Sequence, residues 1–359
     1  MARTVLVAAG GTGGHLFPGI AVADELVRRD GTTRVVFAGT ARGLETRLVP
    51  RAGYALELLP ILPLNGIGLA RMLKGLVVLP WGLLRSLLLV LRLRPAAVLG
   101  IGGYAGGPVT LLAALVGVRA VILEPNAKPG FTNRVLKPFA RAAACAYEET
   151  RDAFGRKGVL TGNPVRGGFA ALPRKEHREP MTLLAFGGSQ GSRVLNRALV
   201  AALPHLPGAE RLRIVHQTGP AMREEVEAAY RAASRPGEVV AFLDDMEARL
   251  AAADLVLARS GATTCAELTV AGRASILVPF ALAADDHQRR NALALEAAGA
   301  ARMLEERDLS GESLGGAVRA LVDAPARLRE MDEAARRLGR PDAAARVADL
   351  LLPAEGARA

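Results

Sequence analysis

The stretch Thr4-Val-Leu-Val-Ala-Ala-Gly-Gly-Thr-Gly-Gly-His15 is a short apolar run that ends in a glycine-rich loop. Apolar residues recur at helical spacing after the loop, and Pro18 stands where the first helical turn would tolerate proline. The stretch therefore predicts a strand, a tight turn and a helix. Backbone N–H groups at a helix N-terminus bind anions, above all phosphate, and His15 stands beside them as a candidate proton acceptor.

The loop is not the dinucleotide-binding fingerprint, because its glycines are in a different order from G-x-G-x-x-G. The next predicted strand, residues 34–38, is followed by Gly39 and Thr40, so no acidic residue stands there to bind a ribose. Both differences disfavour a dehydrogenase. Taken alone, the loop is also compatible with a simple glycine turn that carries a surface histidine.

Alternating strands and helices extend over most of the 359 residues, a length typical of two domains. This alternation predicts an α/β protein with doubly wound parallel sheets. We expect a boundary near Gly162-Asn-Pro-Val-Arg166, and a linker or surface loop over the charged residues 172–180. The predicted domains are residues 1–163 and 164–341, and the sequence leaves open whether a helix over 342–352 completes the second domain or packs on the first. The predicted strands are residues 5–9, 34–38, 55–59, 97–101, 120–123, 142–146, 182–186, 213–217, 239–243, 255–258 and 275–278.

Two further glycine loops, residues 102–108 and 187–192, also follow predicted strands. Ligands of open α/β sheets bind at the carboxyl ends of the strands. Three such loops in two domains therefore predict two facing domains with a ligand cleft between them.

The composition restricts the partners. Lys and Arg total 46 against 35 Asp and Glu, which gives a net charge of +11 and suits phosphorylated substrates or an anionic membrane surface. Nucleic acid is disfavoured, because there is no lysine-rich tail and no basic segment with interspersed aromatic residues. Cys145 and Cys265 lie far apart, without metal-ligand spacing, and are expected to be buried thiols in a reducing compartment. We expect no signal peptide and no spanning helix.

Residues 69–95 form the most apolar segment, and all of its charged residues are basic. One interpretation is a pair of crossover helices buried on the sheet. The other is a membrane-facing patch in which apolar side chains enter the acyl boundary and cations meet anionic headgroups.

The sequence contains no Gly-x-Ser-x-Gly and no His-Glu-x-x-His motif. No acid-x-acid pair ends a strand, and Asp244-Asp245 is interpreted as a helix cap, so we expect no metal and no cofactor. Helix N-termini and arginine would then balance a departing diphosphate. After the strand at 255–258, Glu267 follows a Ser-Gly turn; it is either an acceptor for ribose hydroxyls or a charge favourable to the helix dipole.

The chain resembles the MurG family of N-acetylglucosaminyltransferases of peptidoglycan synthesis. The matching segments run in family order over nearly the whole chain: Gly10-Gly-Thr-Gly-Gly-His15, Gly102-Gly-Tyr104, Glu124-x-Asn126, residues 162–166, Gly187-Gly-Ser-Gln-Gly191, Phe242-Leu-Asp-Asp-Met246, Arg259-Ser-Gly-Ala262 with Glu267, and His287-Gln288. The resemblance implies a GT-B fold and an inverting transfer of GlcNAc from UDP-GlcNAc to the C4 hydroxyl of lipid I, which gives lipid II. It also implies a peripheral enzyme on the cytoplasmic face of the cell membrane.

The resemblance implies a role for each site residue. His15 is the candidate general base, and Thr12, Gly13 and Gly14 are candidates for the diphosphate of the lipid acceptor. The implied donor contacts are Asn126, Arg166, Ser189, Leu243 (backbone, to uracil), Ala262, Thr263, Glu267 (ribose) and Gln288 (sugar hydroxyls). Pro125 and His287 depart from residues common in the family, which leaves the use of His287 in doubt.

Three other functions stay open at this point. A UDP-GlcNAc 2-epimerase has the same architecture and nucleotide but no need of an apolar cationic segment. A glycosyltransferase with another lipid acceptor, such as diacylglycerol, fits the same motifs. A membrane-associated nucleotide-binding protein without activity would bind UDP-GlcNAc and release no UDP.

Overall fold

The computed structural model describes residues 3–10, 13–41, 43–61, 69–283 and 286–353. The chain forms two compact units, one of residues 1–166 with 340–359 and one of residues 167–339. The N-terminal unit therefore includes the C-terminal segment of the chain. Helix α14 (Ala343–Leu351) packs against α1 (Gly13–Arg29), and Arg29 Nη1 lies 2.5 Å from an Asp349 carboxylate oxygen.

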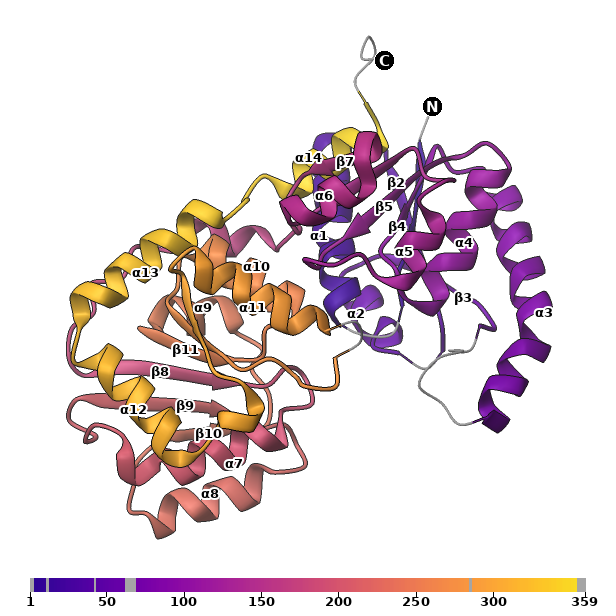
Figure 1. Ribbon diagram of the computed structural model, residues 1–359. Helices are drawn as coiled ribbons and strands as arrows, with labels where there is room; N and C mark the ends of the chain where they lie inside the picture. Colours follow the sequence, from indigo (N-terminus) through magenta and orange to yellow (C-terminus); the bar gives the residue numbers. More distant parts are fainter. Residues whose placement is uncertain (1–2, 11–12, 42, 62–68, 284–285, 354–359) are drawn as a thin grey trace. The chain divides into compact units, whose positions relative to one another are not determined.

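The N-terminal unit contains a parallel seven-stranded sheet in the order β3-β2-β1-β4-β5-β6-β7. Figure 1 shows its helices α3 and α4 side by side. Its central strands are buried on both faces, which is why they are continuous apolar runs in the sequence. Helices α1 and α14 pack on one face, and α3 and α4 on the other. The strands are β1 (Thr4–Ala8), β2 (Arg34–Gly39), β3 (Ala55–Leu58), β4 (Ala97–Gly100), β5 (Arg119–Glu124), β6 (Ala142–Cys145) and β7 (Gly158–Leu160). The remaining helices are α2 (Glu45–Arg51), α3 (Leu69–Leu93), α4 (Gly103–Leu115), α5 (Phe131–Leu136) and α6 (Glu148–Phe154).

The C-terminal unit contains a parallel six-stranded sheet in the order β10-β9-β8-β11-β12-β13. An apolar cluster joins β8, β9, β11 and β12 to helices α7, α8, α12 and α13. The strands are β8 (Met181–Phe186), β9 (Leu212–Gln217), β10 (Glu238–Val240), β11 (Leu255–Ala258), β12 (Ser275–Leu277) and β13 (Ala301–Met303). The helices are α7 (Arg193–Ala202), α8 (Arg223–Ala232), α9 (Met246–Ala252), α10 (Ala262–Ala271), α11 (His287–Ala297), α12 (Gly311–Val322) and α13 (Pro325–Leu338).

Three expectations need correction. Residues 69–93 form one helix with Pro80 inside it, not a pair of helices. The three-residue edge strands β7 and β13 were not predicted. Asp245 takes the N-cap position of α9, but its carboxylate makes no capping hydrogen bond and pairs with Arg249 at 3.0 Å instead. As expected, Cys145 and Cys265 are buried free thiols.

Candidate functional site

Each sheet has one point at which the strand order reverses, between β1 and β4 in the N-terminal unit and between β8 and β11 in the C-terminal unit. Ligands of open α/β sheets bind outside the carboxyl ends of the strands at such points. The loop after β1 leads into α1, whose first residues are Gly13, Gly14 and His15. The loop after β8 leads into α7. Thr12, expected in the first of these loops, lies outside the described residues.

His15 lies against the glycine turn that follows β4. Gly102 and Gly103 have φ angles of 83° and 72°, which side chains rarely adopt. A Cβ atom on Gly103 would lie 3.7 Å from His15 Nδ1, and one on Gly102 would lie 3.9 Å from His15 Nε2. The bare backbone of this turn thus leaves room for the imidazole ring.

Glu124 organises the segment after β5. This carboxylate is 1% exposed and accepts hydrogen bonds from Asn126 N (3.1 Å), Asn126 Nδ2 (3.3 Å), Gly130 N (2.8 Å) and Asn133 Nδ2 (2.9 Å). Burial raises the pKa of Glu124, and the hydrogen bonds from Gly130, Asn133 and Asn126 oppose that shift. Because β1, β4 and β5 are neighbours, Asn126 lies at the same edge of the sheet as His15.

Arg166 is the last residue of the first of the two chain segments that form the N-terminal unit. Its guanidinium carbon lies 5.1 Å from the centroid of the Phe17 ring, two residues after His15 on α1. This cation–π contact places a positive charge beside the first turn of that helix. Arg166 therefore belongs, by its contacts, to the edge that carries His15.

In the C-terminal unit, Arg259 connects the glycine loop to the end of β12. Its guanidinium donates to Ser192 Oγ from Nε (3.2 Å) and Nη2 (2.9 Å), and from Nη1 to the Val278 (3.1 Å) and Pro279 (3.0 Å) carbonyls. It also forms an ion pair with Glu306 and is 9% exposed. Ser192 is the N-cap of α7 and accepts from Leu195 N. One buried arginine thus holds the end of the loop that contains Ser189, which is exposed.

Gln288, in the first turn of α11, is held from two sides. Its side-chain Oε1 accepts from Phe280 N (3.0 Å), and its carbonyl accepts from Ser260 Oγ (2.8 Å). Asn291 Nδ2 donates to the Ser260 carbonyl at 3.1 Å. The turn after β11 and the start of α11 are therefore fixed to each other.

The remaining predicted donor residues lie at the carboxyl edge of the same sheet. Ala262 and Thr263 open α10, and Glu267 is 8% exposed in its second turn. Leu243, 6% exposed, follows β10. The structure thus brings Ser189, Leu243, Ala262, Thr263, Glu267 and Gln288 to one edge of the C-terminal sheet, while Gly13, Gly14, His15, Asn126 and Arg166 belong to the N-terminal unit. Their individual roles stay predictions.

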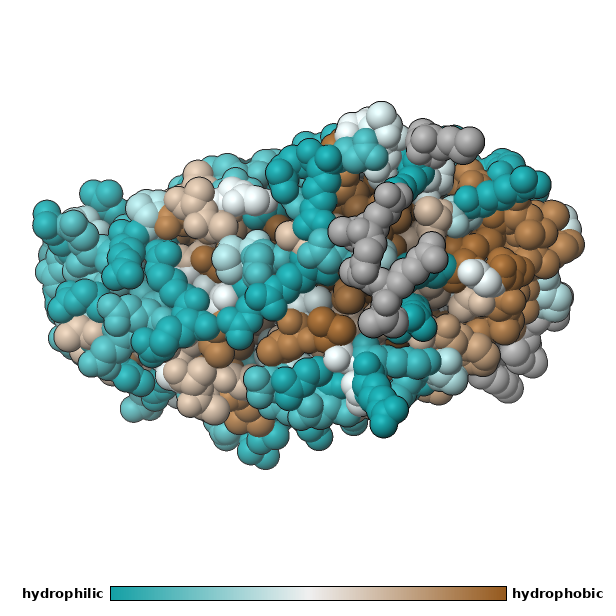
Figure 2. All heavy atoms as spheres, turned by 90° about the horizontal axis from the view of Figure 1, so that it is seen from above, coloured by the Kyte–Doolittle hydropathy of each residue, from teal (hydrophilic) through white to brown (hydrophobic). Residues whose placement is uncertain are grey.

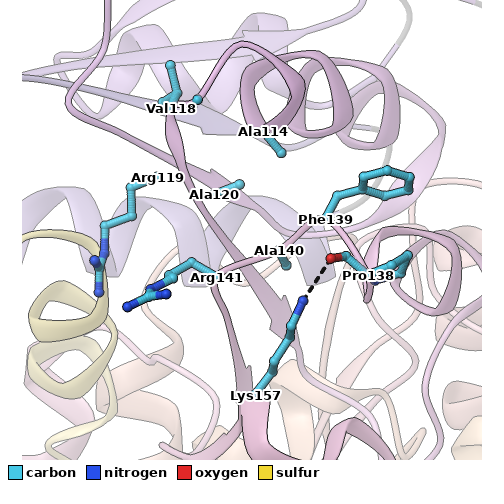
Figure 3. A pocket seen from close by; sticks show the side chains of 10 residues that line it. Ala114, Val118, Arg119, Ala120, Pro138, Phe139, Ala140, Arg141 and Lys157 are labelled. Carbon is cyan, nitrogen blue, oxygen red and sulfur yellow. Dashed lines mark hydrogen bonds between the residues drawn. The ribbon is translucent and has the colours of Figure 1, made fainter. Parts of the chain in front are cut away.

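A hollow of about 400 Å³ lies at the opposite, amino edge of the N-terminal sheet (Figure 3). Its cations have structural partners: Lys157 Nζ donates to the Pro138 carbonyl at 2.8 Å, and Arg119 Nε to the Leu350 carbonyl at 2.7 Å. These contacts cap the carboxyl ends of α5 and α14. We therefore do not assign the chemistry to this hollow.

The outer face of α3 is apolar. Trp81, Leu84, Leu88 and Leu91 are 45–53% exposed, whereas Leu89 and Val90 are buried against the sheet. The Arg85 guanidinium lies 5.9 Å from the centre of the Trp81 ring. Hydrophobic residues also gather on the N-terminal unit in the space-filling view (right-hand side of Figure 2). In the part of the chain that the structure describes, no helix is both long and apolar enough to cross a membrane.

Sequence motifs alone did not assign roles to Asn133 and Arg259. Glu124 and Arg259 were visible as parts of motifs, but most of their partners lie 6 to 67 residues away along the chain. Among the described residues, no group of three or more His, Cys, Asp or Glu side chains is arranged to hold a metal ion.

The fold and the two glycine-loop sites define a glycosyltransferase of two α/β domains. Residues 5–145 match the glycosyltransferase family 28 N-terminal domain, and residues 182–347 match the family 28 C-terminal domain. The chain is 48% identical over 353 residues, covering 97% of this chain and 92% of the relative, to the UDP-N-acetylglucosamine--N-acetylmuramyl-(pentapeptide) pyrophosphoryl-undecaprenol N-acetylglucosamine transferase of Anaeromyxobacter sp. (strain K).

The crystal structure of Acinetobacter baumannii MurG superimposes with a TM-score of 0.79 at 32% identity, over 97% of this chain and 99% of that chain. The chain therefore belongs to the MurG family and has the GT-B fold. A UDP-N-acetylglucosamine 2-epimerase superimposes with a TM-score of 0.69 at 14% identity, over 98% of this chain and 95% of that chain. At this identity the likeness shows the shared fold alone.

Proposed function

We propose that this protein transfers GlcNAc from UDP-GlcNAc to the C4 hydroxyl of N-acetylmuramic acid in undecaprenyl-diphosphate-linked lipid I, with inversion, to give lipid II for peptidoglycan synthesis. The observation that supports this reaction best is the 48% identity, along 97% of the chain, to a transferase whose name contains this donor and this acceptor. The motifs of both units lie at the carboxyl edges that bind ligands in this fold.

In this proposal His15 is the general base. It takes the proton of the acceptor hydroxyl while the hydroxyl oxygen attacks the anomeric carbon from the side opposite UDP. The new C–O bond forms as the bond to the diphosphate breaks, so no covalent enzyme intermediate is needed. The glycines at the start of α1 bind the diphosphate of the lipid acceptor through backbone N–H groups.

The C-terminal unit binds the donor in this proposal. Glu267 accepts hydrogen bonds from the ribose, and Gln288 binds hydroxyls of the sugar. The N-termini of α7 and α10, together with Arg166, balance the negative charge on departing UDP. No metal is part of this scheme.

We also propose that the protein binds peripherally to the cytoplasmic face of the cell membrane through the exposed face of α3. Four large apolar side chains together with basic neighbours and no acidic residue in the helix suit an anionic bilayer surface. This surface would bring the N-terminal unit to the lipid acceptor.

The test is to measure UDP release from UDP-GlcNAc with and without a lipid I analogue. We expect release that depends on the analogue, and a product heavier by one GlcNAc. Formation of UDP-ManNAc without an acceptor would favour an epimerase, and preference for diacylglycerol would favour another lipid acceptor. Donor binding without UDP release under any of these conditions would contradict an enzymatic function.

A further inference from the structure

Asn133 carries a buried amide oxygen that has no hydrogen-bond partner. The residue is 3% exposed, and its Nδ2 donates to the Leu123 carbonyl and to Glu124 Oε2, both at 2.9 Å. Its Oδ1 has no donor within reach. Because the Leu123 carbonyl and the Glu124 carboxylate both accept from Nδ2, the orientation of the amide is determined, and Oδ1 points away from these two acceptors. A buried acceptor of this kind is costly unless it gains a donor during function.

The Asn133 amide and the His15 ring both border the turn at Gly102, and a Cβ atom there would be equally far, at 3.8 Å, from Oδ1 and Nδ2 of Asn133. A Cβ atom on Gly102 would lie 3.8 Å from Asn133 Oδ1 and 3.9 Å from His15 Nε2. Gly102 has no side chain, and its φ of 83° disfavours one. An acceptor atom and an imidazole nitrogen thus lie within 4 Å of one point.

We propose that Asn133, oriented by Glu124, is the positioning residue for His15. Its Oδ1 accepts a hydrogen bond from His15 Nε2–H, which leaves the lone pair on Nδ1 to take the proton of the acceptor hydroxyl. The inference rests on the proposed role of His15 as general base. Catalytic hydrogen bonds are often long in unliganded enzymes and shorten in the substrate complex, so we expect this bond to form when the acceptor binds.

The partner of one ring nitrogen determines which nitrogen of a histidine is the base. When the proton has moved from the hydroxyl oxygen to Nδ1, the ring is an imidazolium, and Oδ1 stabilises its positive charge. The Glu124 carboxylate strengthens this effect, because accepting from Nδ2 polarises the amide and makes Oδ1 a better acceptor. Glu124, Asn133 and His15 would then form a chain of hydrogen bonds, in which only His15 contacts the reacting atoms.

Other charged groups lie on the elements around this turn, among them Lys128 on the segment after β5. Arg166 lies over Phe17, and the ionisable residues of α1 are at its far end, where Arg29 pairs with Glu25 and Asp349. The remaining charged groups on α1 and α5 are Asp24, Arg28 and Arg134. Glu124 is the group that connects to the turn at Gly102, through Asn133.

The test is the pH profile of kcat/KM for a lipid I analogue in the wild type, Asn133→Ala and Asn133→Asp. In Asn133→Ala we expect kcat to fall about 10–100-fold and the acidic limb to move to lower pH, because the imidazolium loses a stabilising oxygen. In Asn133→Asp the limb moves to higher pH, because a carboxylate favours the protonated ring. We expect the KM for UDP-GlcNAc to stay within about twofold of wild type in both, because Glu124 keeps its hydrogen bonds from Asn126 and Gly130.

Asn163→Ala is the matched control. Asn163 is also buried, at 4% exposure, and neither atom of its amide has a partner, but it lies on the segment after β7. We expect its acidic limb to coincide with that of the wild type. Unchanged limbs in both Asn133 variants would overturn the inference. Asn133→Asp keeps the size of the side chain but loses the Nδ2 donor to Leu123 and Glu124, so the fold of each variant is checked by circular dichroism before the limbs are compared. If His15→Ala keeps full turnover, the proposed base itself is wrong; if His15→Ala fails while the Asn133 limbs stay unchanged, only the present inference is wrong.

Discussion

His177 Nε2 lies 3.0 Å from a carboxylate oxygen of Asp332 in the interior of the C-terminal unit. On the other side of the ring, Nδ1 lies 3.1 Å from Asp254. Each carboxylate also accepts from a backbone N–H, Asp254 from Thr182 (2.8 Å) and Asp332 from Ala274 (2.6 Å). The ring between two carboxylates ties the loop before β8 to β11, β12 and α13. Burial lowers the pKa of His177, but hydrogen bonds and charge from Asp254 and Asp332 outweigh burial and raise it.

This arrangement predicts that the C-terminal unit loses stability as the pH rises. An unfolded histidine has a pKa of about 6.5, and the folded value is higher. The contribution is therefore complete below about pH 6.5 and is lost as the pH rises through the folded pKa. Two further basic residues lie near these carboxylates: Lys175 Nζ is 3.5 Å from Asp254 Oδ2, and Arg273 is buried. Unfolding followed from pH 6 to 9 should show a decreasing free energy of unfolding.

His177→Gln should remove this pH dependence and cost about 3 kcal/mol at pH 6, because two buried carboxylates lose their cation. His216→Gln is the control, since burial lowers the pKa of His216 to about 4 and keeps it neutral over the same range. A His177→Gln variant with the same pH slope as the wild type would show that the ring is not protonated.

The sequence predicted strand β11 but not the burial of His177, and the two cases differ in how local the sequence signal is. β11 (Leu255–Ala258) was predicted with its observed bounds, because a strand buried on both faces is a continuous apolar run. Residues 172–180 look like a charged surface loop, yet His177 is buried. Its partners are 77 and 155 residues away, so no local pattern could reveal the contact.

The same limit applies to the site. The three glycine-rich segments after β1, β4 and β8 are local patterns, and the sequence alone located them. The structural roles of Asn133 and Arg259 depend on hydrogen bonds to Glu124 and Ser192, which only the fold brings close to them. Edge strands β7 and β13 have three residues each and are only partly buried, so their apolar signal is weak. One interpretation of residues 69–95 was a pair of helices, but residues 69–93 form one helix, because a proline such as Pro80 inside a long helix can be tolerated at the loss of one hydrogen bond.

His15→Ala should lower kcat far more than it weakens UDP binding. A positioned base contributes about 10²–10⁴ in rate, whereas most of the predicted donor residues lie in the C-terminal unit. UDP affinity by calorimetry and kcat with a lipid I analogue should be measured on the same preparation. Turnover close to the wild-type value would exclude His15 as the base.

Glu267→Ala should weaken UDP binding by about 10–100-fold, because a hydrogen bond to a charged group is worth about 1.5–3 kcal/mol. The nucleotide analogue 2′-deoxy-UDP tests the contact directly. It should bind the wild type less tightly than UDP does, and bind Glu267→Ala about as tightly as UDP does. If UDP affinity is unchanged in the variant, Glu267 does not bind the ribose.

Arg259→Lys should raise the KM for UDP-GlcNAc at least tenfold, although the charge is kept. A lysine cannot reach Ser192 and the carbonyls of Val278 and Pro279 at once, because it lacks the planar fork of arginine. Ser192→Ala is the partial control: it removes the N-cap of α7 at a cost of about 1 kcal/mol and leaves the two carbonyl contacts. If Arg259→Lys has the same KM as the wild type, the loop before α7 and the segment after β12 keep their positions without the guanidinium of Arg259.

Replacing Leu84 and Leu88 on the exposed face of α3 by Ser should weaken binding to anionic vesicles by more than tenfold. Both side chains are about half exposed, so the change should leave the fold intact, while each loses about 1.5–3 kcal/mol of apolar transfer into the bilayer. Cosedimentation with vesicles that contain phosphatidylglycerol measures this directly, and higher salt should weaken binding in all variants because the basic residues act through charge.

The matched control is Leu282→Ser, which removes an apolar side chain that is 83% exposed on the C-terminal unit. It should leave vesicle binding unchanged. A soluble lipid I analogue should be turned over equally by the wild type and the α3 double variant, because α3 carries none of the residues assigned to catalysis or donor binding. Equal vesicle binding by the double variant and the wild type would mean that another surface contacts the membrane.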